Sequence, residues 1–75
     1  MSARDLKSEL KKAKIKKDEI KIVVHNFEAM VKSNKLDKNK VSIVVHNLVA
    51  SEQFRAKFIK NPAGAIDEAN PQPSP

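Results

Sequence analysis

Two stripes of apolar residues with helical spacing constrain the fold more than any other feature of the chain. The first stripe consists of Ile20, Val23, Val24, Phe27, Met30 and Val31, and the second of Val41, Val44, Val45 and Leu48. Steps of three and four residues place each stripe on one face of an amphipathic α-helix. The run Ile-Lys-Ile-Val-Val has β propensity, but its alternation ends at Val24 while the helical period continues to Val31. The spacing therefore predicts helices.

The polar segment between the stripes, residues 33–39, is rich in capping residues, so we predict a helical hairpin of residues 18–34 and 39–50. Before it, residues 3–16 carry only a narrow apolar stripe among lysines, which predicts a loosely docked or frayed helix. After it, Ser51 is suited to cap a short helix reaching about Lys60. Asn61-Pro62 then opens a last helical segment through Ala69.

The predicted fold class is all-α: a small helical bundle of three to five helices on a central hairpin, with a disordered Pro-rich tail. The predicted organisation is a basic N-terminal helix or arm at 1–17, a helical domain at 18–69 and a flexible tail at 70–75. Three prolines in the last five residues favour an extended tail.

The hairpin contains an internal repeat. Residues 22–29 and 43–50 are identical at six of eight positions. The repeat preserves the apolar stripe and also the opposite helical face, which carries Ile22, His25, Asn26, Ile43, His46 and Asn47. One interpretation is a partner-docking surface used twice. The other is that this face packs against the first and fourth helices, or that the two copies have not diverged.

The residue types argue against catalysis and against metal or cofactor binding. The chain has 75 residues, no Cys and one Gly, so thiol chemistry and a Gly-rich phosphate loop are excluded. His25 and His46 are the only histidines, a metal site would need more ligands, and the nearest acids, Glu28 and Glu52, form no recognisable ligand motif with them. The longest apolar runs are too short for a membrane span, and the N-terminus has no apolar signal region. We therefore predict a cytoplasmic protein without enzymatic activity. The absence of Cys also favours the cytoplasmic location, because disulfides are rare in that compartment.

The net charge of +6 is concentrated in the first segment, where residues 1–17 hold seven basic and two acidic residues. Its lysines are Lys7, Lys11, Lys12, Lys14, Lys16 and Lys17. Because they surround the predicted helix, they suit nonspecific contact with phosphates. The alternative is a solvated face that keeps a small protein in solution.

The segment 51–69 combines a Phe-x-x-x-Phe helix, an Asn-Pro pair and a short Ala-rich helix with acidic residues. This pattern resembles the leader region of precursors of ribosomally synthesised, post-translationally modified peptides. The resemblance implies a helical leader that docks a modifying enzyme through Phe54, Phe58, Ile59, Asn61 and Pro62. It also implies that the enzyme modifies the tail, which consists of Asn70, Pro71, Gln72, Pro73, Ser74 and Pro75.

Residue chemistry supports part of this interpretation, because Phe54 and Phe58 stand one helical turn apart and suit a groove on a partner. The alternative is that these rings close the core of the bundle. The leading functional prediction is thus a non-catalytic recognition peptide. The other two are a small basic nucleic-acid-associated protein and an adaptor subunit of a larger complex.

Overall fold

The computed structural model describes residues 3–69 and contains five helices and no strand within that range. The helices are α1 (Ala3–Lys12), α2 (Lys17–Lys32), α3 (Lys38–Ala50), α4 (Glu52–Lys60) and α5 (Pro62–Ala69). The all-α prediction is confirmed. The predicted tail from Asn70 to Pro75 lies outside the described residues. No helix between residues 3 and 69 combines the length and apolar character that crossing a bilayer requires.

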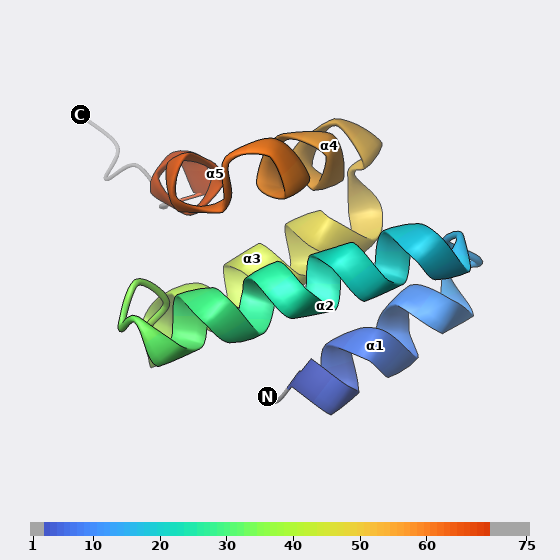
Figure 1. Ribbon diagram of the computed structural model, residues 1–75, viewed down its shortest axis with the longest axis horizontal. Helices are drawn as coiled ribbons and strands as arrows, with labels where there is room; N and C mark the ends of the chain where they lie inside the picture. Colours follow the sequence, from blue (N-terminus) through green and yellow to red (C-terminus); the bar gives the residue numbers. More distant parts are fainter. Residues whose placement is uncertain (1–2, 70–75) are drawn as a thin grey trace.

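The hairpin of α2 and α3 is enclosed by the other helices, with α1 on one side and α4 and α5 on the other (Figure 1). The two predicted stripes meet in one apolar core, except for Val31 at the end of the first stripe, which is 44% exposed. However, no Cα atom of α2 comes within 8 Å of a Cα atom of α3. Each of α1, α4 and α5 contacts both arms, and each of them contributes buried side chains to the core. Both stripes thus face one shared core.

The core draws residues from all five helices and from the connector before α3. Its buried apolar members are Leu6, Leu10, Ile20, Val23, Phe27, Leu36, Val44, Val45, Leu48, Phe58, Ala65 and Ile66. Their burial removes apolar surface from water, which is the main force that holds a disulfide-free chain of this size together.

The prediction of a loosely docked or frayed helix at 3–16 is wrong, because α1 is packed against the core. Leu6 and Leu10 are fully buried, so the narrow stripe is a packing face. The helix ends at Lys12, where Ile15 N donates to the Leu10 carbonyl and Lys14 N to the Lys11 carbonyl. With Lys14 at a φ of 63°, this is the pattern of a Schellman motif. Ile15 then packs against the core and holds the end of α1 in place.

Side-chain caps define where three helices begin. The Asp37 carboxylate accepts hydrogen bonds from Asn39 N and Lys40 N at 2.9 and 3.0 Å, at the start of α3. Ser51 Oγ accepts from Phe54 N at 3.1 Å. Asn61 Oδ1 accepts from Gly64 N at 3.3 Å, and Pro62 follows at the first helical position. The predicted caps Ser51 and Asn61 are confirmed.

Replacing Asp37 with alanine is expected to lower the free energy of unfolding by about 1 kcal/mol, because two amide donors at the start of α3 lose their acceptor. Urea denaturation followed by circular dichroism measures the change. Asp67→Ala removes a carboxylate from the exposed surface of α5 and is expected to have little effect. Equal losses in the two variants would show that the cap contributes nothing specific.

Arg55 connects three helices and is the buried charged residue of the described chain. Its Nε lies 3.1 Å from Oε1 of Glu19 in the first turn of α2. Its Nη1 donates to the carbonyls of Leu48 and Val49 near the end of α3, at 2.9 and 3.1 Å. These carbonyls belong to the last turn of α3, where acceptors lack helical partners and a cation is favoured. Arg55 therefore fixes α4 against both arms of the hairpin.

Candidate binding groove

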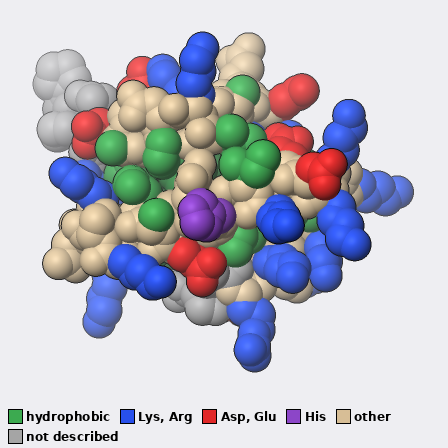
Figure 2. Space-filling view, in the orientation of Figure 1, with side chains coloured by type: hydrophobic (Ala, Val, Ile, Leu, Met, Phe, Trp, Pro, Cys, Tyr) green, Lys and Arg blue, Asp and Glu red, His purple; other side chains and the backbone are tan. Residues whose placement is uncertain are grey.

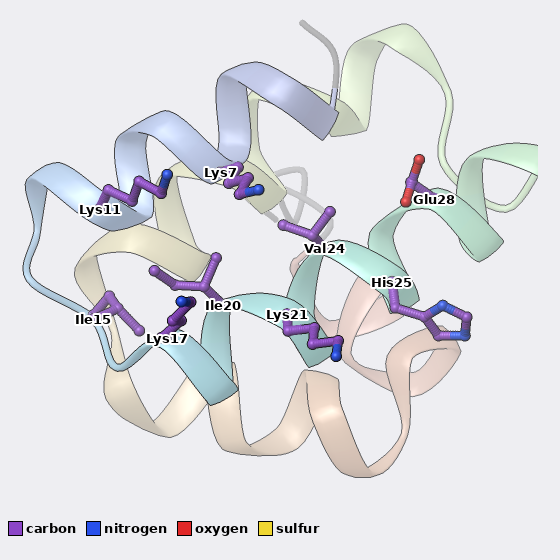
Figure 3. Close-up of a pocket in the computed structure, with 9 residues that line it drawn as sticks. All are labelled: Lys7, Lys11, Ile15, Lys17, Ile20, Lys21, Val24, His25 and Glu28. Atoms are coloured by element: carbon purple, nitrogen blue, oxygen red, sulfur yellow. The ribbon is translucent and has the colours of Figure 1, made fainter.

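A groove of about 730 Å³ lies between α1 and the first three turns of α2. We call it the α1–α2 groove. The residues that line it are Lys7, Lys11, Ile15, Lys17, Ile20, Lys21, Val24, His25 and Glu28 (Figure 3). The local sequence explains it: Lys7 and Lys11 each follow a leucine that α1 buries, so both lysines border the interface with α2.

The groove has an apolar floor and a basic rim. Ile15, Ile20 and Val24 form the floor, and all three belong to the core or pack against it. Lys7 and Lys11 lie on α1 and Lys17 and Lys21 on α2, while His25 points away from α1 (Figure 3). Figure 2 shows Lys and Arg side chains gathered on the side of the molecule where α1 joins α2. With four lysines and one glutamate in the lining, the groove is suited to an anionic ligand that also has apolar surface.

The structure divides the lysines of the predicted phosphate-binding arm. Lys7, Lys11 and Lys17 line the groove, whereas Lys12, Lys14 and Lys16 are exposed outside its lining. Lys21 lines the groove but was not among the predicted residues. The signal was present in the sequence, because Lys21 directly follows the apolar Ile20, as Lys7 and Lys11 directly follow leucines.

The structure places Phe58, one of the predicted docking anchors, in the core of the folded chain. Its side chain is fully buried in the core, so a partner cannot reach it without unfolding α4. Phe54 is half-buried and stacks on Phe58, with ring centroids 6.2 Å apart. Ile59 and Pro62 are half-buried, and Asn61 is exposed. The alternative interpretation, that the phenylalanines close the bundle, describes this structure.

The duplicated second face is used differently in the two arms. In α2, Ile22 and His25 are exposed, but Asn26 is half-buried and its Nδ2 lies 3.4 Å from the carbonyl oxygens of Phe58 and Ile59. This contact brings the α2 face beside the end of α4, as the packing interpretation predicts for Asn26. In α3, His46 is exposed and Ile43 and Asn47 are half-buried.

The two asparagines of the repeat give a matched pair of variants. Asn26→Ala is expected to lower the free energy of unfolding by about 1 kcal/mol, because the last carbonyls of α4 lose a donor. Asn47→Ala makes the same chemical change where, among the described residues, no hydrogen bond of the side chain is found. Denaturation in urea compares the two. A larger loss for Asn47→Ala would contradict a structural role for Asn26.

No cluster of three or more His, Asp or Glu side chains suited to a metal ion occurs within residues 3–69. Comparisons with protein-family models, with curated proteins and with solved structures found no match to this chain. The groove therefore has to be interpreted from its own chemistry.

Proposed function

We propose that this chain is a non-catalytic recognition protein that docks a partner protein through the α1–α2 groove. The observation that carries the proposal is the basic rim over an apolar floor on a bundle whose buried residues are otherwise committed to packing. Interfaces combine such an apolar centre with a polar rim. In this proposal the partner binds the α1–α2 groove, whereas the sequence had suggested that it binds Phe58.

The narrower form of the proposal is a helical leader that presents its C-terminal tail to a modifying enzyme in the cytoplasm. The Asn-Pro junction supports it, because the Asn61 cap and Pro62 set α5, the helix that leads into the tail, at a defined angle after α4. The ion pair between Lys57 and Glu68 further connects α4 to α5. Intact mass of the chain purified from its native host tests this form, which requires residues 70–75 to be altered or removed.

Site-specific photo-crosslinking in the native host tests the docking function itself. A benzophenone amino acid at position 21 lies in the groove, and the same group at position 35 lies on the exposed connector between α2 and α3. A discrete protein adduct from position 21 and none from position 35 is the expected result. The absence of any adduct specific to position 21 would overturn the proposal.

Reversing two rim charges is expected to abolish that adduct. Lys7→Glu with Lys17→Glu, made in the chain that carries the crosslinker at position 21, replaces one lining lysine from α1 and one from α2 and turns attraction for an anionic partner into repulsion. Lys35→Glu with Lys38→Glu has the same net charge at two exposed positions outside the groove and is expected to keep the adduct. Equal loss in both double variants would show that overall charge, and not the groove, attracts the partner.

The second candidate function is nonspecific nucleic-acid binding. It is favoured by the exposed lysines Lys12, Lys14 and Lys16, which extend the basic surface beyond the groove. Electrophoretic mobility shift against duplex DNA over a salt series measures it, since phosphate contacts weaken steeply with salt. Nucleic-acid adducts from position 21 in the crosslinking experiment would favour this function over protein docking.

A further inference from the structure

Resting on the proposed docking function, we infer that the occupant of the α1–α2 groove is an acidic amphipathic helix of the partner protein. The lining has two chemistries that a ligand must satisfy together: an apolar floor of Ile15, Ile20 and Val24, and rows of lysine on both sides. A helix with apolar residues on one face and carboxylates on its flanks satisfies both.

The spacing of the lysines matches a helix. Lys7 and Lys11 are four residues apart on α1, and Lys17 and Lys21 are four residues apart on α2. Each pair therefore lies about one turn apart, roughly 5–6 Å between Cβ atoms. Glutamates four residues apart on each flank of a bound helix have the same spacing. The lining residues of α2 run from Lys17 to Glu28, about three turns, which is enough for apolar anchors at i, i+3 or i+4, and i+7 of a bound helix.

The same lining is poorly suited to nucleic acid. Among the lining residues there is no Phe for base stacking and no Arg, Asn or Gln, so contacts to nucleic acid would come mainly from the four lysines. A phosphate backbone would use the lysines but would leave Ile20 and Val24 without apolar contact. The groove therefore favours a protein ligand over a nucleic acid.

Glu28 gives the bound helix a direction. It lies at the end of the groove away from Ile15 and Lys17, on the third turn of α2 (Figure 3). The positive end of a helix dipole is its N-terminus, which is favoured beside a carboxylate, whereas the C-terminus is favoured beside lysines. The N-terminus of the ligand helix is therefore placed near Glu28 and its C-terminus near Lys11 and Lys17.

The test uses the full chain and synthetic helical peptides in fluorescence anisotropy. The first peptide has leucines at i, i+3, i+4 and i+7 with glutamates on both flanks. The second has the same composition in an order that forms no apolar face. The first is expected to bind about tenfold or more tightly than the second, because only the first covers the floor. Lys7→Glu with Lys21→Glu is expected to weaken that binding about tenfold, and Lys35→Glu with Lys38→Glu to leave it unchanged.

Val24→Thr makes the floor of the groove more polar with little change of shape. It is expected to weaken the binding of the first peptide and to leave the binding of duplex DNA unchanged. Equal affinity for the two peptides would overturn the inference, as would tighter binding to duplex DNA or to phosphatidylserine vesicles than to the first peptide. If one of these contradicting results is found together with a protein adduct from position 21 in the host, the docking function stands and only the inference of a helical ligand is wrong. If position 21 gives no adduct, the docking function itself falls.

Discussion

Phe58→Ala is expected to lower the free energy of unfolding by about 3–5 kcal/mol, because truncating a large core side chain loses transfer free energy and leaves a cavity. Phe58 is fully buried and is one of the two largest fully buried side chains of the described chain. Small domains have total stabilities of about 5–15 kcal/mol, often near the low end. Far-UV circular dichroism with thermal and urea denaturation measures the loss of helix.

Phe54→Ala is the matched control, since it removes the same ring one turn earlier in α4. Phe54 is half-buried and contributes a stacking contact with Phe58, so a smaller loss is expected. A Phe58→Ala chain that kept its helicity and lost only partner binding would contradict the core assignment and restore the docking role. Loss of helicity and binding together is the result that the structure predicts.

The helices and caps that depend on residues close together in the sequence could be predicted from it. The α2 and α3 stripes span several turns at one period, so the pattern alone identified both helices. Ser51 and Asn61 act on amides within three residues, which makes a cap readable from the sequence. The docking of α1 is different, because two leucines among lysines form a weak helix in isolation. The core supplies the stability that its sequence lacks.

The candidate site was predictable only in part. The sequence identified the lysines of the N-terminal segment, but their division between groove and open surface depends on how α1 lies against α2. No local pattern encodes that arrangement. The aromatic pair at positions 54 and 58 fitted an exposed anchor and a core residue equally well. Only the tertiary contact of α4 with both arms of the hairpin separates these alternatives.

Arg55 shows the same limit most clearly. The chain has 13 lysines and only two arginines, so the use of an arginine at position 55 stands out. However, no residue near it in the sequence indicates what the guanidinium binds. Glu19 is separated from it by 36 residues. The planar guanidinium serves a carboxylate and two carbonyls from one position, which an ammonium group cannot reproduce.

Arg55→Ala is therefore expected to lower the free energy of unfolding by about 3 kcal/mol, because hydrogen bonds from a charged donor are lost and the carbonyls of Leu48 and Val49 lose a buried partner. Urea denaturation measures the change. Arg55→Lys keeps the charge but loses the forked geometry, so an intermediate loss is expected. Glu19→Gln is expected to cost about 1 kcal/mol or less, because the Glu19 side chain is 30% exposed and water screens its charge.

The three variants separate the ion pair from the carbonyl contacts. If the ion pair alone held α4 in place, Arg55→Ala and Glu19→Gln would cost the same and added salt would reduce both losses. The structure predicts that Arg55→Ala costs more and that its cost changes little with salt, since two of the three acceptors are uncharged backbone carbonyls near the end of α3. A lysine variant as stable as the original chain would show that charge, and not the shape of the guanidinium, fixes α4 to the hairpin.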